Sequence, residues 1–360
     1  MNRQIKDMQR NPNLDLLRII SLLAIVSYHV LQRWPTQLPS LVTAVSSFGQ
    51  YGVDIFFALS GWLVGLKLYS NSFAINPSKV LLRRIARVMP AYLAALLIAY
   101  LGVAFVRGQY FNFVYLFLLQ NYLDKIPFFL VSWFLCILVQ FYAFVWLLQL
   151  AFRNRYRYIL IVSFAGLALF PLFRIYLVAS GSITEAMQFG YYLTAFHLRG
   201  DTILSSFCAS LFSSMFAKKL QCRLPVRRIS VGLLWLFFFV VWILLAIYRP
   251  EHYKLYYVFS PLLLAIVCTP IVVCCSNSAP FRLRPPPLIF NYIVASLYSV
   301  YLTHPFAIEA AERLLGNNGN GFTYSILVTF LIASFSFCFY LIIEKPFGGF
   351  IGGFLARKAS

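Results

Sequence analysis

Charged residues are scarce in this 360-residue chain, and acidic residues are the scarcest of them. Only 11% of the residues are charged, and Asp and Glu together number 10. Soluble domains carry about a quarter of charged residues, so this composition excludes an ordinary soluble protein. Hydrophobic residues make up 61% of the chain, and its mean hydropathy is +0.79. The composition therefore predicts an integral membrane protein, with one transmembrane domain over residues 1–360 and no separate soluble domain.

Patterns that would indicate a metal centre or a nucleic-acid partner are also missing. The chain has four histidines and seven cysteines, and neither set has the spacing of metal ligands. Most cysteines stand inside apolar runs, where a free thiol behaves as a small apolar side chain. The net charge of +20 does not indicate a nucleic-acid partner, because Lys and Arg occur in short clusters between apolar runs. We therefore predict no metal site and no nucleic-acid binding.

Apolar runs long enough to cross a bilayer recur along the whole chain. A membrane-spanning helix needs about 20 predominantly apolar residues. The sequence therefore predicts an all-α, polytopic membrane protein with about ten transmembrane helices in one bundle. The shorter apolar stretch 111–122 is expected to form an interfacial or re-entrant helix. The ten predicted spans cover approximately 14–34, 50–69, 88–106, 128–151, 157–179, 201–217, 230–248, 256–275, 288–310 and 322–343.

The basic residues are unevenly distributed between alternate loops. With the N-terminus inside, 21 of the 30 Lys and Arg residues fall on the inner side and eight on the outer side. This asymmetry fits the positive-inside rule and predicts that both termini are cytoplasmic. The first run is longer than the core of a signal peptide and lacks a cleavage site, so we expect an uncleaved first span.

Two polar residues in the first run, Arg18 and His29, point to a functional site. Eleven helical residues at about 100° each bring both side chains to nearly the same face, roughly 16 Å apart along the axis. Asp15 shares that face. Ionisable residues inside a membrane span are costly and mark functional sites by default. We predict that the Arg18 end of the run binds an anion and that His29 carries out proton chemistry.

The second run begins with the segment GVDIFFALSGWLVG (52–65), whose acidic residue Asp54 is surrounded by hydrophobic side chains. Such an acid needs a partner, and the antiparallel order of the first two runs places Asp54 near the same outer boundary as His29. A carboxylate beside an imidazole fixes its tautomer, so Asp54 is expected to orient His29. The alternative is a favourable charge at a helix N-terminus. Gly61 and Gly65 indicate close helix packing.

A basic cluster precedes the third run in the segment KVLLRRIARVMPAY (79–92). Arg84 and Arg87 are three residues apart and share a helix face, and Arg83 adds charge beside them. The planar guanidinium fork matches phosphate oxygens, so this cluster predicts a cytoplasmic phosphate-binding site. The alternative is a cluster that only anchors the topology.

Other polar residues near the spans have less certain roles on sequence grounds. His304, in the ninth run, is either a site residue or a satisfied histidine at a proline kink. His197, Arg199 and Asp201 precede the sixth run, and solvated loop charges are favoured over contacts with a sugar. Glu344 is expected to anchor the end of the last span.

Several motifs in order along the chain give it a specific resemblance. Together with the ten-span count, they make the chain similar to the membrane acyltransferase type 3 family over nearly its whole length. The motifs are the first run with Arg18 and His29, GVDIFFALSGWL, RRIARVMPAY, SWFLCILVQFY at 132–142, YSVYLTHPF at 298–306 and IEKPF at 343–347.

Members of that family move an acyl group, commonly acetyl from acetyl-CoA, to a hydroxyl of a glycan such as lipopolysaccharide O-antigen or exopolysaccharide. The resemblance implies a multi-pass enzyme of the bacterial inner membrane, with acetyl-CoA as a co-substrate and not as a bound cofactor. It implies that His29, Arg18 and Asp54 form the catalytic group. The phosphates of CoA are then expected on Arg84 and Arg87, the matched pair, with Arg83 beside them.

One departure from the family pattern is visible, because Leu138 stands where many relatives have a glutamate. Some relatives also carry a periplasmic hydrolase-like domain, which is not expected here because the sequence ends at Ser360. His29 is expected to act either as the general base on the acceptor hydroxyl or as a transient acetyl carrier. The alternatives to an enzyme are a transporter or flippase for a lipid-linked or acyl-bearing substrate, and a catalytically silent scaffold. The runs show no internal repeat of the kind that builds many transporters.

Overall fold

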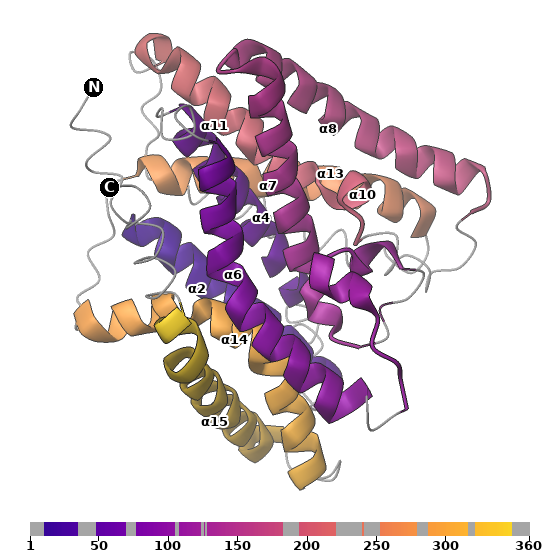
Figure 1. Cartoon of the computed structure of the whole chain (residues 1–360), viewed down its shortest axis with the longest axis vertical. Coiled ribbons are helices and arrows are strands. Elements are labelled where there is room, and N and C mark those ends of the chain that lie inside the picture. The colour runs from indigo at the N-terminus through magenta and orange to yellow at the C-terminus, as the bar shows by residue number, and fades with distance from the viewer. Residues whose placement is uncertain are drawn as a thin grey trace. The chain divides into compact units, whose positions relative to one another are not determined.

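The computed structural model shows a wholly helical protein wherever it describes the chain. In that part, ten α-helices and several short 3-10 and π segments account for all regular structure (Figure 1). The prediction of an all-α fold is therefore confirmed. The predicted span 230–248 lies outside the described residues except for position 240. The described residues are 11–34, 48–69, 77–104, 108–123, 126, 128–182, 194–220, 240, 253–278, 287–315 and 321–347.

Seven of the predicted spans coincide with helices that are long and apolar enough to cross a bilayer, among the residues described. Their mean hydropathies lie between 1.3 and 2.5, as expected for helices in contact with lipid. The chain is therefore a multi-pass membrane protein. These helices are α2 (Pro12–Arg33), α4 (Gly52–Tyr69), α6 (Pro77–Ala99), α7 (Trp133–Phe152), α8 (Tyr156–Ala179), α13 (Tyr253–Asn277) and α15 (Gly321–Phe339), the last continuing into the π-helical turn η7 (Tyr340–Glu344).

Two further helices, α11 (Asp201–Leu220) and α14 (Pro287–Leu315), match the predicted sixth and ninth runs. They have 20 and 29 residues, which is long enough to span, but they are not among the seven helices whose length and hydropathy both mark a membrane span. Their polar side chains pair with neighbouring helices. The hydroxyl of Thr303 in α14 lies 2.7 Å from that of Ser336 in α15, and Ser205 in α11 lies 2.6 Å from Thr269 in α13. Tertiary hydrogen bonds thus satisfy polar side chains that would be costly in lipid if they were unpaired.

The stretch 111–122 is not the single helix that the sequence predicts. It forms two 3-10 turns, η3 (Phe113–Phe117) and η4 (Gln120–Tyr122), and Leu118 between them adopts a left-handed conformation with φ 54°. Tyr115 is fully buried, and its hydroxyl donates to the Phe128 carbonyl at 2.8 Å. Tertiary hydrogen bonds therefore stabilise this stretch, which lacks the continuous backbone hydrogen bonds of a regular helix.

The contacts divide the chain into two compact units. Unit 1 comprises residues 1–21, 51–78 and 137–283, and unit 2 comprises 22–50, 79–136 and 284–360. In unit 1, α11 packs against α4, α8 and α13, and in unit 2, α14 packs along α15 (Figure 1). The helix α2 is continuous and contributes residues to both units.

Helices α4 and α11 approach so closely that only glycine fits at their crossing. A Cβ atom at Gly61 would lie 2.0 Å from the Ile203 carbonyl oxygen, and one at Gly65 would lie 2.8 Å from the Ser210 Cβ. Absence of a side chain lets the two backbones meet, which confirms the packing role expected for both glycines. The same unit buries an apolar cluster consisting of Leu14, Leu17, Ile55, Ala58, Leu59, Trp62, Val267, Cys268, Ile271 and Val272.

We expect the substitution Gly61→Ala to destabilise unit 1. The added methyl group would meet backbone atoms that cannot rotate away, and overpacking of this kind costs about 1–3 kcal/mol. The melting temperature of the purified protein in detergent should therefore fall. Gly102→Ala is the control, because no atom lies within 4 Å of a Cβ at that position. Equal melting temperatures for the two variants would contradict the close approach.

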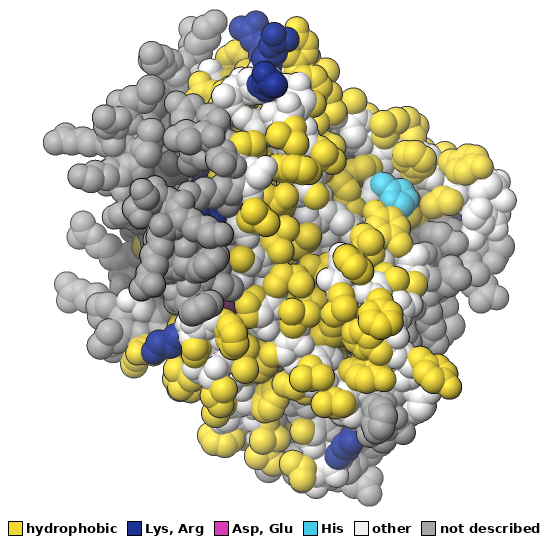
Figure 2. Space-filling model, in the orientation of Figure 1, with side chains coloured by type: hydrophobic (Ala, Val, Ile, Leu, Met, Phe, Trp, Pro, Cys, Tyr) yellow, Lys and Arg dark blue, Asp and Glu magenta, His cyan; other side chains and the backbone are white. Residues whose placement is uncertain are grey.

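The exposed surface is rich in large hydrophobic side chains. Figure 2 shows that hydrophobic side chains spread over most of the described part of the visible face, whereas Lys and Arg occur there at few places. Leu23, Leu97, Ile161 and Phe330, which come from four different spans, are each more than half exposed. Water would not tolerate so much apolar surface, so these faces are suited to lipid.

Candidate functional site

Helix α2 carries two of the predicted site residues, Arg18 and His29. Pro12 stands at its first position and Asp15 in its first turn, both favourable at a helix N-terminus. Arg18 Nη1 lies 2.5 Å from Asp15 Oδ1, and the Asp15 side chain is almost completely buried. Arg18 itself is partly exposed. The Arg18 guanidinium therefore has a carboxylate partner and offers only its remaining donors to an anion.

His29 lies near the other end of α2, half-buried, with a second histidine beside it. The ring centroids of His29 and His304 are 5.2 Å apart, and the Tyr28 ring lies 5.1 Å from His29. The sequence left the role of His304 open, and the structure brings it to the predicted catalytic imidazole. Only the tertiary packing of α2 on α14 could reveal this pair, since 275 positions separate the two residues.

His304 is completely buried in α14 and only one of its ring nitrogens is satisfied. Nδ1 lies 3.2 Å from the Val300 carbonyl oxygen, one helical turn earlier. In the described part of the chain, Nε2 has no hydrogen-bond partner. The satisfied histidine that the sequence offered as an alternative is therefore only half satisfied, and an unpaired buried nitrogen is rare enough to require an explanation.

Ion pairs join the C-terminal end of α2 to α14. The Arg33 guanidinium pairs with Glu312 and lies 3.8 Å from Glu309, while Arg313 Nη2 lies 3.0 Å from Glu309. Val30 packs beside them in an apolar cluster with residues of α14 and α15. These contacts lie within three turns of His29 on α2 and of His304 on α14, and they help to keep the two helices together.

Asp54 is buried as predicted, but its described partners differ from the predicted one. Its Oδ2 accepts from Arg199 Nη2 at 2.6 Å, and its Oδ1 accepts from the Thr202 hydroxyl at 3.1 Å. Both carboxylate oxygens are thus engaged within unit 1, so Asp54 as the orienting partner of His29 has no support from these contacts. A buried carboxylate needs an opposite charge, and Arg199 supplies it from the turn before α11.

The expectation that Arg199 and Asp201 are solvated loop charges is wrong. Arg199 is 7% exposed and Asp201 is fully buried. Asp201 accepts two hydrogen bonds from Arg174, at 2.7 and 2.8 Å, and Arg174 also donates to the carbonyls of Val258 and Leu198. The sequence held one signal, because Arg174 stands inside the fifth apolar run, where a cation requires a partner.

The arginines of α6 lie at or near the surface. Arg83 and Arg87 are exposed, and Arg84 is half-buried. Arg87 acts electrostatically on Glu344 at the end of α15, whose carboxylate accepts from the Ser299 hydroxyl at 2.5 Å. The three arginines lie on one helix of unit 2, and His29 on α2 also belongs to unit 2, whereas Arg18 and Asp54 belong to unit 1.

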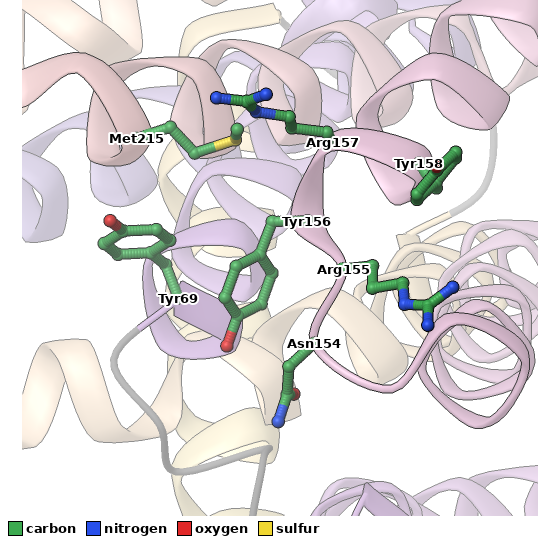
Figure 3. Close-up of a pocket in the computed structure, with 7 residues that line it drawn as sticks. All are labelled: Tyr69, Asn154, Arg155, Tyr156, Arg157, Tyr158 and Met215. Atoms are coloured by element: carbon green, nitrogen blue, oxygen red, sulfur yellow. The ribbon is translucent and has the colours of Figure 1, made fainter.

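A cavity of about 380 Å³ opens elsewhere in unit 1, where α8 begins. The rings of Tyr69 and Tyr156, 5.2 Å apart, lie side by side at its centre (Figure 3). Arg157 extends toward Met215, whereas Arg155 extends away from the tyrosines (Figure 3). The cavity contains none of the predicted site residues.

No group of three or more His, Cys, Asp or Glu side chains arranged to hold a metal occurs among the described residues. Leu138 is buried in α7, in an apolar setting where the glutamate of the relatives would need its own partner.

Comparison with known proteins gives the chain its family. The acyltransferase domain family matches residues 11–343. Two Staphylococcus aureus proteins, from strains MSSA476 and COL and each named as a candidate O-acetyltransferase, are 27% identical over 373 residues. These alignments cover 95% of this chain and 58% of each relative, so the chain spans little more than half their length.

A shorter similarity extends to YrhL of Bacillus subtilis strain 168, named as a candidate peptidoglycan O-acetyltransferase. The two chains are 35% identical over 83 residues, which is 22% of this chain and 11% of YrhL. No solved structure matches the chain. Because the family match extends over nearly the whole chain, this protein belongs to the acyltransferase 3 family of multi-pass membrane proteins.

Proposed function

We propose that this protein is an O-acetyltransferase that moves an acetyl group from cytoplasmic acetyl-CoA to a hydroxyl of a cell-surface glycan. The observation that carries the proposal is the composition of unit 2. It combines a half-buried imidazole, His29, beside a second imidazole with three arginines on α6 whose side chains reach the surface. Acyl transfer to a hydroxyl needs a proton acceptor, and CoA brings phosphates that require cations.

His29 acts as the general base in this proposal. It takes the proton of the acceptor hydroxyl as the oxygen attacks the thioester carbon, and it returns the proton to the departing CoA thiolate. An acetyl-histidine intermediate is the alternative course. Arg84 and Arg87, with Arg83 beside them, bind the phosphates of CoA. Arg18 lies eleven residues before His29 on α2 and is partly exposed. In this proposal its guanidinium offers further hydrogen bonds to acetyl-CoA.

The acceptor is a surface glycan, and two classes follow from different arguments. The resemblance favours lipopolysaccharide O-antigen or exopolysaccharide, whereas the name of YrhL favours peptidoglycan. Mass spectrometry of both glycan fractions from a deletion strain and its complemented parent separates them. Loss of an acetyl ester from one fraction, restored by the wild-type gene, identifies the acceptor. Unchanged acetylation in both fractions would refute the proposed function. A transporter, the alternative, would not consume acetyl-CoA.

We expect the double substitution Arg84→Ala/Arg87→Ala to raise the KM for acetyl-CoA by at least about tenfold. Charge-assisted hydrogen bonds contribute about 1.5–3 kcal/mol each, and 1.4 kcal/mol corresponds to a factor of ten. The value of kcat should change little, because the arginines bind the part of CoA that does not react. Initial rates of CoA release by membrane vesicles measure both quantities.

The matched control is Arg155→Ala/Arg157→Ala, which removes the same charge from an exposed pair in unit 1. An equal rise of KM in this control would show that general surface charge, and not the α6 cluster, attracts acetyl-CoA.

A further inference from the structure

The His29 and His304 imidazoles lie next to each other in unit 2. Their ring centroids are 5.2 Å apart with an angle of 34° between the ring planes. Two imidazole nitrogens joined by a hydrogen bond of ~2.9 Å have ring centroids about 5 Å apart, since each nitrogen lies ~1.1 Å from its ring centre. The observed separation therefore allows a direct hydrogen bond after rotation of one ring.

The contact with Val300 determines which nitrogen of His304 carries the proton. A carbonyl oxygen can only accept, so Nδ1 of His304 must donate to Val300 across the 3.2 Å separation. A neutral imidazole has one N–H and one bare nitrogen, so Nε2 is the bare acceptor. This acceptor is fully buried and has no partner in the part of the chain that the structure describes. Such a group costs free energy unless a donor reaches it.

The nearby carboxylates are already occupied. Glu312 and Glu309 at the end of α14 pair with Arg33 and Arg313. The Tyr301 ring, 6.0 Å from that of His304, donates its hydroxyl to the Val131 carbonyl at 2.7 Å. Of the described neighbours, the ring of His29 is thus the donor best placed for Nε2 of His304.

We propose that His304 is the positioning residue of His29, in place of a carboxylate. The bare Nε2 of His304 accepts the N–H of His29 and holds it in the tautomer whose other nitrogen is unprotonated. This inference rests on the proposed function, because that unprotonated nitrogen is the one that removes the hydroxyl proton. The oxygen–acyl bond then forms, the carbon–sulfur bond breaks, and the proton passes from His29 to the thiolate. His304 gains and loses no proton in the cycle.

Two substitutions of similar size separate this role from a structural one. The amide of Asn reaches the position of Nδ1, so His304→Asn keeps the donor to Val300 and removes the acceptor. The amide of Gln reaches the position of Nε2, so His304→Gln keeps an acceptor and removes the donor to Val300. We expect kcat for CoA release from acetyl-CoA by membrane vesicles with their native acceptors to fall about 100-fold in His304→Asn and less than about tenfold in His304→Gln. The KM for acetyl-CoA should not change in either variant.

The opposite order of activities would overturn the proposal, because it would show that the contact with Val300 matters more than the acceptor. Full activity of His304→Asn alongside an inactive His29→Ala would also overturn it while leaving the proposed function intact. If wild-type vesicles release no CoA, the proposed function fails. A measurement that needs no turnover then tests the hydrogen bond between His29 and His304.

That measurement is ring nitrogen NMR of the full-length protein in lipid, with 15N-labelled histidine. The chain has only four histidines, so single substitutions assign their signals. We expect His304 to show a protonated Nδ1 and a bare Nε2, and the tautomer of His29 to change in His304→Asn but not in His304→Gln. Identical His29 nitrogen shifts in the wild type and in His304→Asn would refute the hydrogen bond.

Discussion

The substitution His29→Ala is expected to reduce acetyl transfer to the acceptor glycan by about 100- to 10,000-fold, the usual contribution of a general base. The methyl group can neither accept the hydroxyl proton nor carry an acetyl group. Because His29 is only half-buried, its removal should leave the fold intact. Incorporation of labelled acetyl into surface glycans at equal protein level measures the effect.

His197→Ala is the chemically matched control for this substitution. His197 packs against the Phe173 ring at 5.9 Å in unit 1, and burial lowers its pKa. It should retain the activity of the wild type. Acetylation that persists in His29→Ala at normal protein level would remove His29 from the reaction and with it the general-base mechanism.

The substitution Asp54→Ala is expected to have the largest effect on stability. It leaves the Arg199 guanidinium buried without its carboxylate, and breaking a buried ion pair on one side costs about 3–5 kcal/mol. Thr202 also loses its acceptor. The protein should therefore unfold at a lower temperature in detergent and accumulate to a lower level in membranes.

The double substitution Asp54→Leu/Arg199→Met separates this structural role from a catalytic one. Replacement of both partners by apolar side chains leaves no unpaired charge, and such exchanges are often neutral for stability. We expect the double variant to recover most of the stability lost in Asp54→Ala. If it also recovers activity, Asp54 acts through the fold. A stable double variant without activity would instead indicate that the Asp54 carboxylate takes part in catalysis.

Hydropathy and charge were sufficient to predict the class of the protein. Apolar runs of about 20 residues form membrane-spanning helices because backbone hydrogen bonds must be satisfied internally in lipid, and this requirement is local to each run. The prediction failed for the stretch 111–122, where hydrogen bonds from Tyr92 and Tyr115 to distant carbonyls replace those of a helix. The prediction of cytoplasmic termini is still based on charge alone.

The choice of candidate site residues also rested on local information, whereas the partners of these residues could not be found locally. Arg18, His29 and the α6 arginines could be singled out because an ionisable group in or beside a span is costly and needs a reason. The sequence indicated equally well that Asp54 needs a partner. It could not select Arg199 over His29, because the choice depends on how α4 packs against α11 at Gly61.

The sequence by itself thus determined that this is an all-α, multi-pass membrane protein, and it singled out His29 on α2 as the candidate for proton transfer. Only the tertiary structure decided which side chains meet. It paired Asp54 with Arg199, buried Asp201 against Arg174, and placed His304 beside His29. The physical reason is that helix formation and membrane insertion follow from each segment alone, whereas the pairing of buried charges and rings depends on contacts between segments far apart in the chain.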